Sequence, residues 1–152
     1  MDALFWFNVL TRWLHVTSAV IAVGALLLLP LLLIPALQVQ EPAVRQAMLA
    51  QVAPRLRIVL HSALGLLLVT GFYNYWVAIP KVRALENRSL YHPIIGTKIL
   101  LALILFGMVS ALLSSRDVAA NMGEDRSRWL AVLIILALVI LFLSAILRRL
   151  WA

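Results

Sequence analysis

The chain contains no cysteine, and few of its 152 residues are charged. The absence of cysteine excludes disulfides, thiolate metal sites and thiol catalysis. Charged side chains make up 12% of the residues and hydrophobic ones 64%, whereas a soluble domain usually carries about twice that charged fraction. An apolar excess of this size needs a solvent other than water. The composition therefore indicates a protein that folds in a lipid bilayer.

Acidic residues are also scarce, since six Asp and Glu stand against 13 Lys and Arg, for a net charge of +7. The basic residues are spread over all the loops and form no basic face, so nucleic acid is not the expected partner. Anionic lipid head groups, or the carboxylates of a bound cofactor, are the partners that this charge favours. No Gly/Ser-rich or charge-rich linker divides the chain, which predicts a single domain over residues 1–152.

Four long apolar runs are present. Each has roughly the 20 residues that a helix needs to cross the hydrocarbon core, and a crossing segment must be helical because unpaired backbone groups are costly in lipid. The sequence predicts an all-α, integral membrane four-helix bundle with helices at about 5–37, 57–79, 94–115 and 129–149. A short interfacial helix is expected at about 42–53, between Pro42 and Pro54. Pro30 and Pro35 predict a bend or an early exit of the first helix.

An even number of spans puts both termini on the same side, here called the terminal side. Six basic residues lie toward each side, so the positive-inside rule gives no orientation. A multi-pass protein of a bacterial inner (cytoplasmic) membrane is the expected setting. The fourth helix carries only Ser144 as a polar residue within its span, which is typical of a helix that packs against lipid or against another membrane redox subunit.

Ionisable side chains inside a membrane span are candidates for function because burying them is costly. The sequence offers two on the first helix, two on the second and two around the start of the third: Arg12, His15, Arg57, His61, His92 and Lys98. From the helical rise, His15 lies roughly 7 Å and Lys98 roughly 9 Å from the midplane toward the terminal side, and His61 roughly 9 Å toward the opposite side. This difference in level disfavours one metal ion held by His15, His61 and His92 together, and also one haem with His15 and His61 as its two axial ligands.

A haem with a single histidine ligand could lie toward the terminal side or toward the opposite side of the membrane. On the opposite side, His61 would be the ligand, Arg55 and Arg57 would receive the propionates, and Met108 would be a sixth ligand, since haem iron takes His/Met pairs. On the terminal side, His15 would have Arg12 one turn away and Lys98 across from it.

Each of these residues also has a purely structural interpretation. The histidines would then hydrogen-bond between helices or lie at the interface, and for His92, which precedes Pro93 in an expected loop, this interpretation is favoured. Lys98 would extend to the head groups, Met108 would pack, and Arg55 and Arg57 would anchor the interface.

Three segments resemble a known membrane family. The runs RWLHVTSAVIAVGALLLLPLLL, RLRIVLHSALGLLLVTGFYNYW and YHPIIGTKILLALILFGMVSALLSSRD are similar to the first three helices of the copper-resistance D (CopD) type membrane domain. The same pattern resembles the HemJ-like protoporphyrinogen oxidases, which are four-helix membrane proteins associated with haem b. The resemblance implies that His15 is the family's helix-one histidine and Lys98 its helix-three lysine. His61 has no counterpart, and the methionine-rich motifs of copper handling are absent.

The leading hypothesis is a haem b-binding membrane protein that serves electron transfer, alone or as a subunit of a membrane redox complex. A HemJ-like enzyme that oxidises a porphyrinogen near His15, Arg12 and Lys98 is the first alternative. A structural or accessory subunit without a cofactor is the second, and a copper-handling membrane protein is the third.

Overall fold

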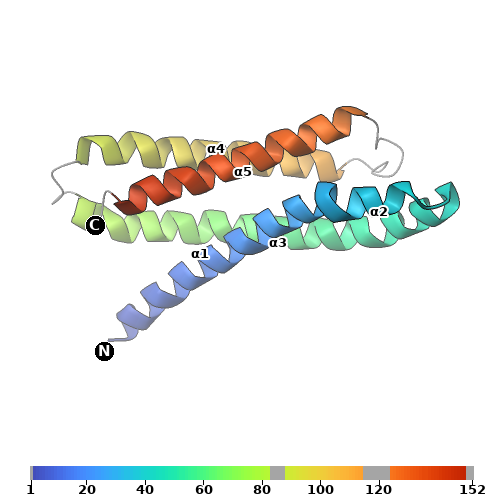
Figure 1. Ribbon diagram of the computed structural model, residues 1–152. Coiled ribbons are helices and arrows are strands. Elements are labelled where there is room, and N and C mark those ends of the chain that lie inside the picture. The colour runs from blue at the N-terminus through green and yellow to red at the C-terminus, as the bar shows by residue number, and fades with distance from the viewer. Residues whose placement is uncertain (1, 83–87, 115–123, 150–152) are drawn as a thin grey trace.

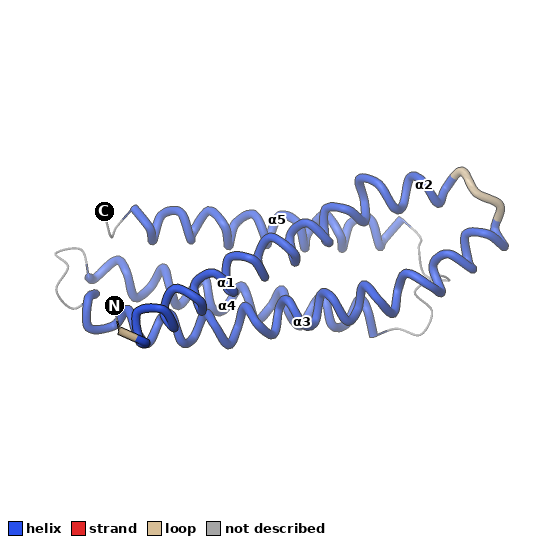
Figure 2. Tube along the Cα trace, turned by 90° about the horizontal axis from the view of Figure 1, so that it is seen from below, coloured by secondary structure: helices blue, strands red, loops and turns tan. Residues whose placement is uncertain are grey.

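The computed structural model describes residues 2–82, 88–114 and 124–149, and these residues form an antiparallel bundle of long helices (Figure 1). The elements are α1 (Ala3–Leu28), the π-helical turn η1 (Leu29–Leu33), α2 (Ile34–Gln38), α3 (Pro42–Val82), α4 (Arg88–Ser114) and α5 (Glu124–Arg149). Four stretches are long and apolar enough to cross a membrane: Ala3–Gln38, Pro42–Pro80, Ser89–Leu112 and Arg128–Arg149. The predicted all-α fold with four membrane helices is thus confirmed. In both views the start of α1 and the end of α5 lie at the same end of the bundle, here the terminal end (Figures 1 and 2).

The first apolar run is continuous and changes its pitch where its prolines lie. Pro30 has no N–H to donate to Leu26, and its ring crowds the carbonyl of that residue. The helix contains one wider turn at this point, in which the backbone N–H of Ile34 donates to the carbonyl of Leu29. A π-turn of this kind accommodates the interruption without ending the helix. The bend expected near Pro30 is therefore a local change of pitch, and the helical path continues to Gln38.

The segment expected to form a separate interfacial helix at 42–53 is instead the first part of α3. This helix runs unbroken for 41 residues and contains Pro54 in its interior, so the predicted boundary at Pro54 is wrong. Figures 1 and 2 show α2 continuing the path of α1 and the first turns of α3 running back beside it, beyond the ends of α4 and α5. Leu37 on α2 and Leu49 on α3 are both buried in this extension.

The third helix begins earlier than its hydropathy indicates. α4 starts at Arg88, six residues before the predicted start at 94, and Pro93 lies inside it. His92 is consequently a helical residue and not part of a loop, contrary to expectation. The fourth predicted span, 129–149, is extended by α5 to Glu124. Both corrections have the same cause, because polar first turns lower the local hydropathy without preventing helix formation.

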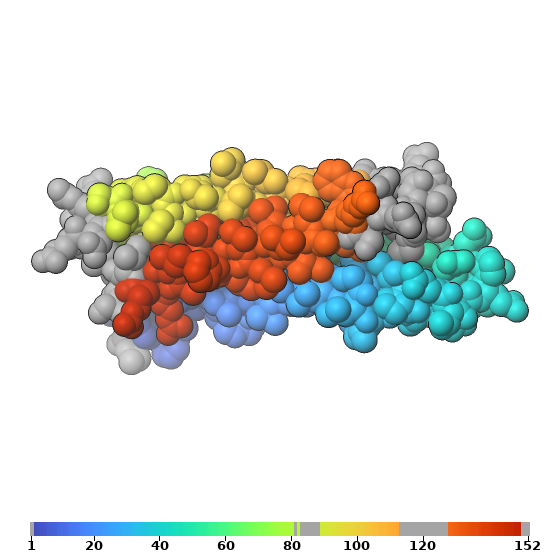
Figure 3. All heavy atoms as spheres, turned by 45° about the horizontal axis from the view of Figure 1, so that its top comes forward, coloured from blue at the N-terminus to red at the C-terminus, as the bar shows by residue number. Residues whose placement is uncertain are grey.

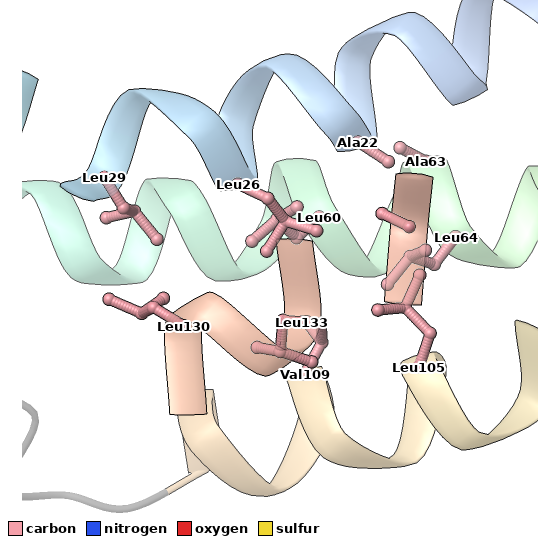
Figure 4. Close-up of a cluster of buried hydrophobic side chains, with 11 residues drawn as sticks. Ala22, Leu26, Leu29, Leu60, Ala63, Leu64, Leu105, Val109, Leu130 and Leu133 are labelled. Atoms are coloured by element: carbon pink, nitrogen blue, oxygen red, sulfur yellow. The ribbon is translucent and has the colours of Figure 1, made fainter. Parts of the chain in front are cut away.

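A cluster of buried apolar residues joins all four helices in the half of the bundle away from the termini (Figure 4). Small residues Ala22 on α1 and Ala63 on α3 lie against each other there, which lets the two helices approach closely. Val109 of α4 and Leu133 of α5 are each 1% exposed. The cluster consists of Ala22, Leu26, Leu29, Leu60, Ala63, Leu64, Leu105, Val109, Leu130, Leu133 and Ala137.

The terminal half is packed differently. A second buried cluster there joins the end of α3, the start of α4 and the end of α5, through Ala78, Val82, Tyr91 and Leu147. No residue of α1 belongs to this cluster. Figure 1 shows the reason, since α1 slopes away from the other helices toward its N-terminal end, and hydrogen bonds at Asn8 and Thr11 still join it to α3. The terminal half of α1 therefore depends mainly on its contacts with α3.

The outer surface of the bundle is apolar. Trp76 is 76% and Phe142 66% exposed, and between 11% and 22% of the residues in the most apolar part of each span are buried. Figure 3 shows the side chains of α4, α5 and the α1–α2 stretch as neighbouring ridges along one face of the molecule. A surface of this kind is stable in contact with lipid and not with water, so the chain is a multi-pass membrane protein.

Candidate functional site

His15 is held in a defined orientation between α1 and α3. Its Nδ1 lies 2.9 Å from Oγ1 of Thr70, a side chain that is buried on α3. The Thr70 hydroxyl has one hydrogen, which it donates to the backbone carbonyl of Leu66 one turn earlier. The hydrogen between His15 and Thr70 must then come from the imidazole. Neutral His15 accordingly carries its proton on Nδ1 and keeps a lone pair on Nε2.

Gly71 allows this close approach. A Cβ atom at position 71 would lie 3.1 Å from Cε1 and 3.6 Å from Nδ1 of His15, whereas no atom lies within 4 Å of the corresponding point at the other described glycines. The absence of a side chain at Gly71 is thus specifically matched to the imidazole ring.

The charge of Lys98 on α4 acts on the imidazole of His15. Its ammonium lies within electrostatic range of the imidazole, and its side chain is half-buried. None of the four membrane-spanning stretches contains an Asp or a Glu. A cation at this depth, without an acidic residue in any span, favours binding of an anionic group.

Arg12 lies one turn before His15 on α1 and is exposed. It is close enough along the helix to extend the positive charge of the same region. His15, Lys98 and Arg12 therefore form the candidate site, at the terminal half of the bundle where α1 leaves the other helices. The helical rise predicts that His15 and Lys98 share a level, and the charge of Lys98 acts on the imidazole.

His61 has a different environment in the other half of the bundle. Its Nδ1 lies 2.8 Å from the backbone carbonyl oxygen of Arg57, which can only accept, so Nδ1 is the donor. Its Nε2 lies 3.1 Å from Oγ of Ser110 on α4, and its ring meets Phe106 edge-on with centroids 5.9 Å apart. Both nitrogens are engaged, and His61 links α3 to α4. A metal ion would have to displace Ser110 to reach it.

Met108 is not placed to bind the same iron as His61. The two α4 residues that contact His61 are Phe106 and Ser110, one turn apart on one face of the helix. Met108 lies two residues from each, about 200° around the helix axis, and packs against the core cluster. The hypothesis of a His61/Met108 pair is therefore not supported by this arrangement.

The remaining candidates lie at the surface. Arg55 and Arg57 are exposed on α3, and His92 is exposed beside the ring of Tyr91, with centroids 6.0 Å apart. His15 contacts Thr70, which lies nine residues or roughly 13 Å along α3 from His61. His15 and His61, which are both half-buried, thus belong to separate sites.

A polar network between α1 and α3 was not anticipated from the sequence. The Tyr73 hydroxyl donates to Oδ1 of Asn8 over 2.8 Å, and Thr11 lies 3.4 Å from Oδ1 of Asn74. Together with His15 these residues line the α1–α3 contact in the terminal half. The available signal was the spacing of polar residues every three or four positions along the first helix: Asn8, Thr11, His15 and Ser18.

Within residues 2–82, 88–114 and 124–149, no group of three or more His, Cys, Asp or Glu side chains could hold a metal ion. A cofactor at His15 would therefore use one protein ligand from this chain's histidines. The likeness to CopD-type and HemJ-like proteins stays a prediction. No protein-family model, curated protein or solved structure matches this chain.

Proposed function

We propose that this chain is a haem b-binding protein of the bacterial inner membrane that serves electron transfer, with His15 as the axial ligand of the iron. The observation that carries the proposal is that a histidine nitrogen with a lone pair and a cation without an acidic residue in any span belong to the same candidate site. In the tautomer that Thr70 selects, His15 Nε2 has a lone pair, and the further partner of the imidazole is the backbone carbonyl of Leu67. Lys98 is a cation within a span, and no span contains an acid.

Haem b satisfies both groups with one molecule, because it brings an iron that binds imidazole nitrogen and propionates that pair with cations. The ring orientation is already set by Thr70, and a histidine ligand typically donates its second N–H to an oriented acceptor in this way. Lys98 and Arg12 would neutralise the carboxylates. When bound, the haem would supply one-electron chemistry at its iron, and the apolar surroundings would set its potential.

The test is the visible spectrum of the chain purified in detergent after expression with ample haem. We expect a Soret band that is lost in His15→Ala and kept in His61→Ala, its matched control in the other half of the bundle. Lys98→Gln should lower haem retention without abolishing it, because it removes one charge and no ligand. A colourless preparation of folded protein would refute the proposal, and loss of the band in His61→Ala alone would move the site to the other side.

The proximity of Lys98 to His15 also favours the HemJ-like alternative, in which the same cations hold the carboxylates of a porphyrinogen. The two functions separate in one assay. Oxidation of protoporphyrinogen to protoporphyrin by the purified chain with an added electron acceptor, at a lower rate in Lys98→Gln, would indicate the enzyme. A haem-loaded chain that leaves the porphyrinogen untouched would indicate the electron carrier.

A further inference from the structure

In the half of the bundle away from the termini, a serine hydroxyl donates its proton to a histidine. Oγ of Ser110 on α4 lies 3.1 Å from Nε2 of His61 on α3. The backbone carbonyl oxygen of Arg57 lies 2.8 Å from Nδ1 and accepts the one hydrogen of the neutral ring, so Nε2 has the lone pair and the hydroxyl is the donor. A hydroxyl, an imidazole that accepts its proton and a third group that orients the imidazole form the arrangement of an activated nucleophile.

Ser110 differs in this respect from other hydroxyl residues of the bundle. Thr70 on α3 and Ser144 on α5 donate to the backbone carbonyl one turn earlier in their own helices, which is a common bond for a serine or threonine inside a helix. The same local bond is geometrically open to Ser110, yet its hydroxyl is bonded to the imidazole of another helix. Its proton is therefore held by a base, which is the condition for an alcohol to act as a nucleophile.

The space beside this pair is open on the side of the membrane midplane. Gly65 lies one turn after His61 on α3, and Gly107 lies one turn before Ser110 on the antiparallel α4, so both glycines are displaced toward the midplane (Figure 1). A Cβ atom at either position would meet no atom within 4 Å, in contrast to Gly71. Close helix packing therefore does not require these two glycines, and Gly107 is exposed to lipid. They leave room for an acyl chain next to the hydroxyl.

The depth of the pair fits a carbonyl group at the membrane surface. The apolar span of α4 ends at Leu112, two residues or roughly 3 Å along the axis after Ser110. Lipid ester groups lie at this boundary between the hydrocarbon core and the polar region, where water is also present. Arg57 is exposed one turn before His61 on the same face of α3. Its positive charge is suited to stabilise an oxyanion that forms at Ser110.

We propose that Ser110 and His61 are the nucleophile and the general base of a hydrolase for acyl esters drawn from the bilayer. Ser110 Oγ attacks the acyl carbonyl carbon, His61 Nε2 takes the hydroxyl proton, and the carbonyl oxygen becomes the oxyanion. The ester C–O bond then breaks, and His61 returns the proton to the departing alcohol. Water, which gives a proton to His61, attacks the acyl-serine; a carboxylic acid leaves, and Ser110 regains its hydrogen. None of these steps uses His15 or the proposed haem.

A decyl fluorophosphonate, which phosphonylates activated serines, tests the nucleophile in the full chain in nanodiscs of ether-linked lipid. We expect one adduct by intact mass, located at Ser110 by peptide sequencing and absent in Ser110→Ala. Labelling should be roughly a hundredfold slower in His61→Gln, which removes the general base. Ser144→Ala, whose hydroxyl bonds to its own helix, is the control and should label as the parent does. A folded parent chain without an adduct, an adduct at another serine, or equal rates in parent and His61→Gln would overturn the proposal.

Hydrolysis of p-nitrophenyl acetate and p-nitrophenyl decanoate in the same nanodiscs tests the substrate class. Gly107→Leu fills the space assigned to the acyl chain, so it should slow hydrolysis of the decanoate roughly tenfold and leave that of the acetate unchanged. Gly96→Leu is the matched control, because it is exposed on the same helix with no atom within 4 Å of its Cβ. Equal effects of Gly107→Leu on both esters, or labelling of Ser110 without hydrolysis of either ester, would overturn the assignment to acyl esters.

Discussion

Replacing Gly71 with alanine tests the contact that positions His15. The added Cβ would lie 3.1 Å from His15 Cε1, which is about 0.4 to 0.9 Å short of the optimal separation of two carbon atoms. The contact can be relieved in two ways. If the imidazole swings aside, its bond to Thr70 is lost, at about 0.6 to 1.7 kcal/mol for a hydrogen bond within a membrane. If the helices move apart, overpacking of this kind costs about 1 to 3 kcal/mol.

The expected loss in the free energy of unfolding is therefore about 1 to 2 kcal/mol. Reversible unfolding in mixed micelles with increasing sodium dodecyl sulfate, followed by circular dichroism, measures it. Gly65→Ala is the matched control, since it lies on the same helix with no atom within 4 Å of the new Cβ. It should stay within about 0.5 kcal/mol of the parent.

A double-mutant cycle identifies the partner. In a His15→Ala background the cost of Gly71→Ala should disappear, because the atom it meets has been removed. Equal stability of the Gly71 and Gly65 variants, or a cost that persists without the imidazole, would refute the proposed packing of His15 against α3.

Three further substitutions probe the hydrogen bonds that link the helices. Thr70→Val should leave the His15 Nδ1 hydrogen without its acceptor, cost about 1 kcal/mol and change the ring tautomer seen by nitrogen-15 NMR, whereas Thr70→Ser should restore both; an unchanged tautomer in the valine variant would contradict the assignment. Ser110→Ala should cost about 0.6 kcal/mol, the usual value within membranes, and leave any Soret band intact, so loss of the band would return His61 to the cofactor site. Tyr73→Phe should lower stability by a similar amount, and no change in the unfolding midpoint would show that its bond to α1 contributes nothing.

The helices were predictable in number and type because twenty apolar residues have one stable form in lipid, whatever their neighbours are. Their ends were not. Pro54 predicted a boundary that α3 does not have, and the start of α4 was placed six residues late. A helix end depends on which neighbour covers the next turn, and hydropathy averaged along one segment does not contain that information.

The candidate site was predicted in part. The rise per residue predicted His15 and Lys98 at one level and His61 at another, and in the structure the charge of Lys98 acts on His15. Residue spacing could not show that Ser110 hydrogen-bonds to Nε2 of His61, or that Met108 packs against the core cluster. Those facts depend on the rotation of α4 about its own axis, which is set by packing against α3 and α5.

The sequence by itself determined that this protein has four membrane helices, because each of four apolar runs of about twenty residues pairs its own backbone groups in lipid as a helix. It also determined that cations, and no acids, would lie within the spans. The tertiary structure alone decided which histidine keeps a lone pair. Thr70 and Gly71 orient His15 and leave its Nε2 available, while Ser110 engages that of His61. The difference between a candidate ligand and a helix-linking residue is therefore made by the neighbouring helix, through one hydroxyl in each case.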